Sequence, residues 1–114
     1  MELIHTCYRI TDIDRSVAFY TALGFEERRR MPIRDEAINV FMGLPGDGDR
    51  LELTYNHGVD SYELGTGYGH IALTVDDMDA TLDALGGTRP VADLRALACK
   101  GLDEPVEVAP LSWR

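Results

Sequence analysis

The sequence predicts an α+β protein made of paired βαβββ modules, of which the second is incomplete. Two observations support this prediction. An internal repeat aligns HTCYRITDIDRSVAFYTALGF with HIALTVDDMDATLDALGGTRP without a gap and places His5 over His70. Apolar and polar residues also alternate over short stretches between turn residues, which is typical of half-buried strands. We expect a single domain over residues 1–114, with module one at 1–60 and a shortened module two at 65–114.

Module one is predicted to contain one helix and four strands. The helix is indicated by Thr11 or Asp12 as its cap, by the apolar stripe Ile13, Val17 and Tyr20, and by Gly24 as its stop. Short turns between the later strands predict an antiparallel sheet with the helix packed across one face. The expected strands are Leu3–Ile10, Phe25–Met31, Ala37–Met42 and Leu51–Asn56.

The second of these strands is expected to end at Pro32 and to lie exposed. The run Arg28–Arg30 resembles an anion site. A solvated sheet edge, on which charges discourage pairing with other chains, is the simpler interpretation.

Module two is predicted to begin as module one does. Tyr68–Val75 is expected to be a strand, followed by a helix capped by Asp76 or Asp77. The repeat gives this helix the stripe Met78, Leu82 and Leu85.

The remainder of module two does not repeat the strand pattern of module one. Val91–Lys100 has a helical pattern and Val106–Val108 a short strand pattern. The repeat counterpart of Glu52 would lie beyond Arg114, so we expect the second module to be cut short or to have diverged at its end.

Charge and composition exclude some classes of partner. The formal net charge of −9 argues against binding to nucleic acid or to an anionic membrane surface. No apolar run approaches the roughly 20 residues of a membrane span, and the N-terminus does not have the pattern of a signal peptide. We therefore expect a cytoplasmic protein. The two cysteines, Cys7 and Cys99, do not predict a disulfide framework.

Several polar residues are predicted to lie on one face of the sheet. His5, Cys7 and Arg9 alternate with apolar residues on the first strand, and Glu52 and Asn56 do so on the fourth. Cys7 can line a site there, although a small buried or half-buried residue in a reduced compartment is the simpler interpretation. His70 lies opposite the apolar face of its own predicted strand. Each of these residues also has a plain structural interpretation, but the repeat of His5 at His70 favours a site built between two modules.

The sequence resembles glyoxalase I (lactoylglutathione lyase) of the vicinal oxygen chelate superfamily, in particular its short bacterial type. The resemblance covers roughly Met1 to Leu85 and is densest in LIHTCYRITDIDRSVAFYTALGF and in LELTYNHGVDSYELGTGYGHIALTVD. It implies a metal-dependent lyase that isomerises the hemithioacetal of methylglyoxal and glutathione to S-lactoylglutathione. It also implies a homodimer whose sites form between module one of one chain and module two of the other.

The resemblance assigns roles to individual residues. It implies that His5, Glu52 and His70 bind a divalent metal, nickel or zinc, and that Glu52 is the catalytic base. It implies that Arg9 and Asn56 hold the glutathione moiety, or another low-molecular-weight thiol. The fourth ligand of the family, a Glu in the second module, has no counterpart, because Glu104 and Glu107 lie outside the family's closing motif.

Other functions on the same scaffold stay open at this point. Two His and one carboxylate also suit an iron oxygenase. A protein that sequesters small molecules without chemistry and a degenerate remnant are further alternatives. Impaired catalysis is also open, because Glu52 would be the sole base beside the metal.

Overall fold

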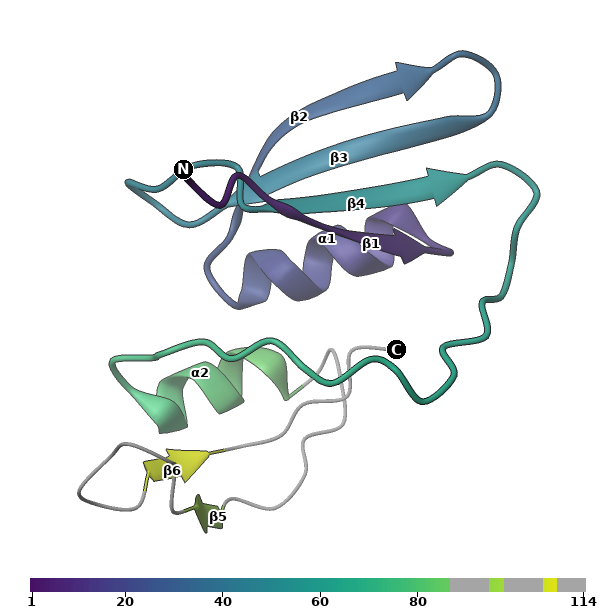
Figure 1. The fold of residues 1–114 in the computed structure, drawn as a ribbon. Coiled ribbons are helices and arrows are strands. Elements are labelled where there is room, and N and C mark those ends of the chain that lie inside the picture. Colours follow the sequence, from purple (N-terminus) through teal and green to yellow (C-terminus); the bar gives the residue numbers. More distant parts are fainter. Residues whose placement is uncertain (87–94, 98–105, 109–114) are drawn as a thin grey trace. The chain divides into compact units, whose positions relative to one another are not determined.

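The computed structural model describes residues 1–86, 95–97 and 106–108 (Figure 1). The chain divides into two compact units, Met1–Asp76 and Asp77–Arg114, which are considered separately below.

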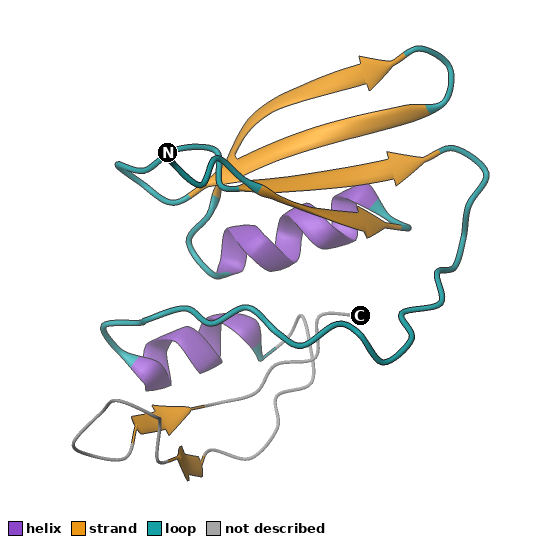
Figure 2. Ribbon diagram, viewed as in Figure 1, coloured by secondary structure: helices purple, strands orange, loops and turns teal. Residues whose placement is uncertain are grey.

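The first unit contains the predicted βαβββ order (Figure 2). Its strands form one sheet in the order β1-β4-β3-β2, so β1 and β2 are the two edges. The predicted elements are all present, with small differences at their ends. The elements are β1 (Thr6–Ile10), α1 (Ile13–Ala22), β2 (Glu26–Ile33), β3 (Ala37–Gly43) and β4 (Leu51–Asn56).

The sheet is mixed, and the prediction of a purely antiparallel sheet is wrong. The pairs β2–β3 and β3–β4 are antiparallel, but β1 pairs with β4 in parallel. The helical crossover explains this difference, because α1 returns the chain to the end at which β1 began, so β2 runs in the direction of β1. Two hairpins then reverse the chain twice, which leaves β4 parallel to β1.

The core lies between α1 and one face of the sheet (Figure 2). Of the two predicted caps, Asp12 is the one that caps α1, since its carboxylate accepts a hydrogen bond of 3.0 Å from the Arg15 backbone N–H. Gly24 follows the helix at φ +103°, a conformation that favours glycine. The buried hydrophobic side chains of this unit are Ile10, Phe19, Tyr20, Phe25, Ala37, Val40, Phe41, Met42, Leu51 and Leu53.

Strand β2 continues past Pro32, which was expected to end it. Pro32 pairs with Ile38 in the β2–β3 ladder. Proline is tolerated there because β2 is an edge strand with one free side. All eight residues of β2 are exposed, which agrees with the solvated edge predicted from Arg28–Arg30.

Strand β1 begins later than predicted, at Thr6 instead of Leu3. The Thr6 backbone N–H donates a 3.0 Å hydrogen bond to the Arg50 carbonyl oxygen, and Leu3 and Ile4 before it are exposed. His5 therefore lies just outside the ladder.

The expected strand at Tyr68–Val75 is not a strand in the structure. The segment has no assigned secondary structure, and Tyr68, Ile71 and Leu73 are exposed. A strand needs a neighbouring strand for its backbone hydrogen bonds, and none in the described part of the chain pairs with this segment.

The second unit contains α2 (Met78–Leu85) and a strand pair, β5 (Arg95–Leu97) with β6 (Val106–Val108). Asp77 caps α2 as predicted, since its carboxylate accepts from the Ala80 backbone N–H at 3.0 Å. The predicted strand at Val106–Val108 is confirmed. The predicted helix at Val91–Lys100 is wrong at Arg95–Leu97, where pairing with β6 forms a strand. The remainder of that range, and Glu104, lie outside the described residues.

Neither helix of the described chain combines the length and the apolar character that crossing a membrane requires.

The loop between β3 and β4 comes very close to Gly43. A Cβ atom at Gly43 would lie 2.4 Å from the Gly48 carbonyl oxygen, whereas a Cβ at Gly48 would meet nothing within 4 Å. We expect Gly43→Ala to lower the free energy of unfolding by about 1–3 kcal/mol, the usual cost of overpacking. Urea denaturation measures this change, with Gly48→Ala as the matched control. Equal stabilities of the two variants would contradict the close approach.

Candidate active site

The open face of the sheet, opposite α1, carries the candidate site. Its central row crosses all four strands, because register places Cys7 beside Glu52, Glu52 beside Phe41 and Phe41 beside Arg29. His5 precedes β1 by one residue. The alternation predicted for β4 is confirmed, since Leu51 and Leu53 are buried and Glu52 faces the other way.

His5 and Glu52 meet directly on this face. The distance from His5 Nε2 to Glu52 Oε2 is 2.8 Å. The Glu52 side chain is 14% exposed and that of His5 is 36% exposed, so the pair is open to a ligand without being fully solvated. The edge of the His5 ring also packs against Phe41, with ring centroids 5.8 Å apart. Phe41 thus limits the positions that the imidazole can take.

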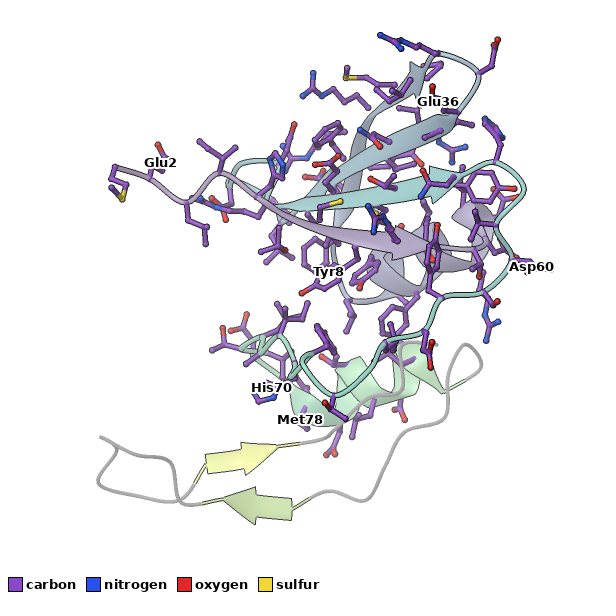
Figure 3. All side chains as sticks on the ribbon, turned by 45° about the vertical axis from the view of Figure 1, so that its right-hand side comes forward. Glu2, Tyr8, Glu36, Asp60, His70 and Met78 are labelled. Carbon is purple, nitrogen blue, oxygen red and sulfur yellow. The ribbon has the colours of Figure 1, made fainter. Side chains whose placement is uncertain are left out.

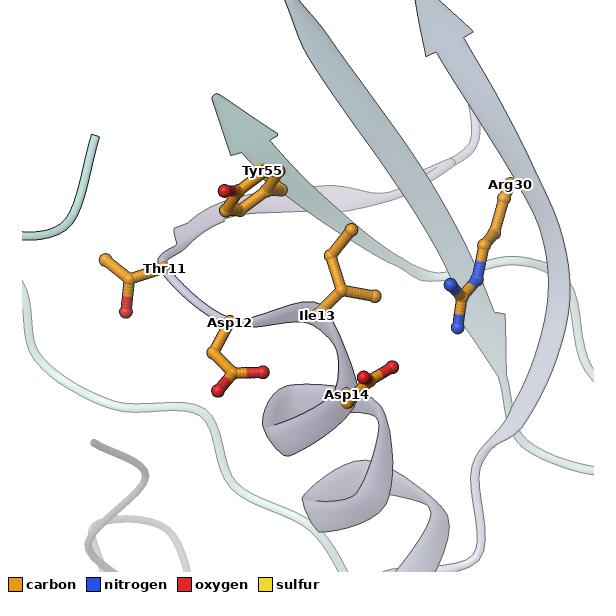
Figure 4. A pocket seen from close by; sticks show the side chains of 6 residues that line it. All are labelled: Thr11, Asp12, Ile13, Asp14, Arg30 and Tyr55. Carbon is orange, nitrogen blue, oxygen red and sulfur yellow. The ribbon is translucent and has the colours of Figure 1, made fainter. Parts of the chain in front are cut away.

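His5 borders a hollow of about 560 Å³. Its lining includes His5, Arg29 and Phe41 from the sheet and Arg50 from the loop before β4. A second hollow, of about 380 Å³, lies at the N-terminus of α1 (Figure 4). Two of its three charged groups are already engaged, because Asp12 caps the helix, and Arg30 bonds to Glu27, which raises the pKa of Arg30. The hollow beside His5 is therefore the better candidate.

Polar side chains from β1, β3 and β4 lie around Glu52. The Thr54 hydroxyl donates to Asn39 Oδ1 at 2.9 Å and lies 3.5 Å from Glu52 Oε1. Cys7 is exposed as a free thiol, with its Sγ 3.3 Å from the same hydroxyl. Sequence reasoning missed Asn39, Phe41 and Arg29 as neighbours of the site. Strict alternation from Asn39 would have placed Phe41 on the open face. The run INVFMG is apolar at nearly every position, so its pattern does not reveal which residues face the core.

Arg9 and Asn56 lie on the same face, further along β1 and β4. Arg9 is exposed and pairs in register with Thr54. The Asn56 side-chain amide donates to the Tyr62 hydroxyl at 2.9 Å. Asn56 thus secures the segment after β4 and retains its side-chain oxygen as an acceptor. Tyr62 is thus the hydrogen-bond partner of a predicted site residue.

His70 does not join His5 and Glu52 within one chain. It is exposed in the segment that follows Tyr68 (Figure 3). Among the described residues, no group of three or more His, Cys, Asp or Glu side chains is placed to hold a metal ion. The structure therefore brings together two of the three predicted metal ligands.

Comparison with known proteins identifies the family. Residues 2–89 match the model of the glyoxalase/bleomycin resistance protein/dioxygenase superfamily. The chain belongs to this superfamily.

Individual relatives point to one branch of the superfamily. The chain is 46% identical over 81 residues to lactoylglutathione lyase of Escherichia coli O157:H7, covering 68% of this chain and 60% of that protein. It is 44% identical over 90 residues to lactoylglutathione lyase of Haemophilus influenzae, covering 75% and 66%. The structure of Leishmania major glyoxalase I, described as trypanothione-dependent, superimposes with a TM-score of 0.74 at 29% identity, covering 99% of this chain and 87% of that one.

The chain spans only part of the length of its relatives. The matched region covers 24% of a probable chloroplastic lactoylglutathione lyase of Arabidopsis thaliana and 66% of the H. influenzae enzyme.

A tyrosine pair holds the start of the segment that carries His70. The rings of Tyr8 on β1 and Tyr68 meet edge to face, with centroids 5.8 Å apart. Burial, together with the hydrogen bond to Tyr8, raises the pKa of Tyr68.

This raised pKa predicts a loss of stability at alkaline pH. The folded state favours the neutral phenol, so the contribution is complete below the ordinary tyrosine pKa of about 10 and is lost as the pH rises through the higher pKa of the folded state. We expect the urea midpoint of Tyr68→Phe to fall less steeply with pH than that of the wild type, when both are measured between about pH 8 and pH 11. Identical slopes for the two proteins would contradict the role of Tyr68.

Proposed function

We propose that this chain provides the metal site of a lactoylglutathione lyase. The reaction would convert the hemithioacetal of methylglyoxal and glutathione, or another low-molecular-weight thiol, into the S-lactoyl thioester. The observation that supports it most directly is the 2.8 Å approach of His5 Nε2 to Glu52 Oε2 on an open sheet face. The relatives named lactoylglutathione lyase indicate the same chemistry.

The His5–Glu52 pair fits a divalent metal. Ligand atoms about 2.1 Å from an ion and at right angles to each other lie about 3 Å apart, close to the distance observed here. A neutral imidazole and a carboxylate suit nickel or zinc. A bound ion would polarise the substrate oxygens and stabilise the negative charge that develops on them.

Glu52 would move the proton. Its carboxylate would take the proton from the carbon that bears sulfur and return it to the neighbouring carbon, so that an aldehyde-level centre becomes a thioester and the ketone becomes an alcohol.

Arg9 and Asn56 would position the thiol. The exposed guanidinium of Arg9 can pair with a carboxylate of glutathione in bidentate geometry. The side-chain oxygen of Asn56 can accept a hydrogen bond from the peptide while its amide remains bonded to Tyr62.

A second copy of the chain would complete each site. His70 is exposed and apart from His5 and Glu52 in one chain, so we propose that it reaches the His5–Glu52 pair of a partner copy. Exposed apolar side chains at Met31, Ile33, Ile71 and Leu73 give such a homodimer surface to bury. We propose the cytoplasm, where glutathione is available, as its compartment.

A thioester assay tests the function. We expect purified protein loaded with nickel or zinc to form S-lactoylglutathione from methylglyoxal and glutathione. Glu52→Gln should lower kcat by about 10²- to 10⁴-fold, because it removes the base and keeps the shape of the side chain. The absence of thioester in the metal-loaded wild type would overturn the proposal, and iron as the retained metal would favour an oxygenase instead.

Mixing two variants tests the shared site. We expect His5→Ala and His70→Ala each to abolish metal retention, measured by metal analysis after gel filtration. A mixed dimer of the two variants contains one site with both histidines intact, so mixing with subunit exchange should restore binding at one site per mixed dimer. Metal retention by either variant alone would contradict the ligand assignment. Light scattering that shows only monomer would contradict the shared site.

A further inference from the structure

Arg29 presents a fixed cation on the open face of the sheet. Its guanidinium carbon lies 4.4 Å from the centroid of the Phe41 ring. Stacking of this kind holds a guanidinium in place and leaves the N–H groups at its edge available for hydrogen bonds.

The neighbouring arginines are used differently. Arg28 lies 3.2 Å from Glu26, Arg30 is 2.8 Å from Glu27, and Arg50 is 3.1 Å from Asp47. Within the described residues, Arg29 makes no ion pair with a carboxylate. Its charge is therefore not explained by a structural partner.

Arg29 shares a hollow with His5, one of the candidate metal ligands. His5, Phe41 and Arg29 all line it, and the Phe41 ring touches both of the other side chains. Register places Arg29 in the same row as Glu52, two strands away, which is about 10 Å at the usual strand spacing. A ligand bound at the His5–Glu52 pair would need to extend by only a few bonds to reach it.

The acidic groups around this hollow do not cancel the charge of Arg29. Asp47 bonds to Arg50, which holds the pKa of that carboxyl below its usual range, and Asp49 lies 3.9 Å from Arg28. Glu2 lies 3.9 Å from Arg50. Each acid has another arginine as its nearest cation.

We propose that Arg29 binds an anionic substituent on the carbonyl half of the substrate and so gives preference to 2-oxoaldehydes that carry a carboxylate. This inference rests on the proposed function, in which Arg9 and Asn56 take the thiol half on the β1–β4 side. The β2–β3 side, where Arg29 and Phe41 lie, then receives the substituent of the oxoaldehyde. The guanidinium, held over the Phe41 ring, would pair with the carboxylate of the substituent.

Two matched glutathione derivatives test this specificity. Binding of S-benzylglutathione and S-(4-carboxybenzyl)glutathione is measured by titration calorimetry on the metal-loaded wild type, Arg29→Gln, Arg29→Lys and Arg30→Gln. The benzyl group stands for the carbonyl half, and the two ligands differ only in the carboxylate. We expect the carboxylate to improve the affinity of the wild type about tenfold, as a charge-assisted hydrogen-bonded pair would.

The variants show whether the preference for the carboxylate depends on Arg29 or on a neighbouring arginine. Arg29→Gln should bind the two ligands equally, and Arg29→Lys should keep part of the preference because it retains the charge without the planar fork. Arg30→Gln should keep the full preference, because Arg30 pairs with Glu27. Affinity for S-benzylglutathione should change less than threefold in Arg29→Gln.

Each contrary result has a distinct meaning. Equal binding of both ligands by the wild type, or a preference that survives in Arg29→Gln, overturns the role of Arg29 and leaves the proposed lyase untouched. A wild type that binds neither ligand overturns the glutathione-dependent function, and the role of Arg29 with it.

Discussion

The parallel pairing of β1 with β4 is the constraint on which the candidate site depends. Its register sets Cys7 opposite Glu52, and His5, two residues earlier on the same side of the chain, then reaches the Glu52 carboxylate at 2.8 Å. Because side chains alternate along a strand, a slip of one residue in this pairing would turn Glu52 or the β1 side chains toward α1. The site is thus a consequence of how one edge strand is placed.

The same strand, β4, supplies both the core and the site. Leu51 and Leu53 are at most 3% exposed and fix the position of the strand against α1, and Glu52 between them faces the open side. Packing energy on one face therefore holds a carboxylate in position on the other. This arrangement is useful for a ligand to a metal, because a rigid backbone limits how far the carboxylate can move when an ion or substrate binds.

The open face is organised by contacts between unlike side chains. Phe41 meets the His5 ring in a T-shaped contact and carries Arg29 over its face, so one aromatic ring orients an imidazole and a guanidinium together. At the other end of the face, Asn56 bonds to Tyr62, and Tyr8 meets Tyr68. These contacts link the segment that leads to His70 with the strands that carry the other candidate ligands.

The sequence alone determined the βαβββ order, the starts of both helices to within one residue, the exposed edge strand and the faces of β4, because these follow from local patterns of polarity and from backbone preferences near single residues. Only the tertiary structure decided the parallel β1–β4 pair, the 2.8 Å contact of His5 with Glu52, the place of Phe41 and Arg29 beside it, and the lack of a strand partner for residues 68–75 within the described part of the chain. These features depend on which strands become neighbours and in which register. Residues far apart in the chain set that choice together, so no local pattern contains it.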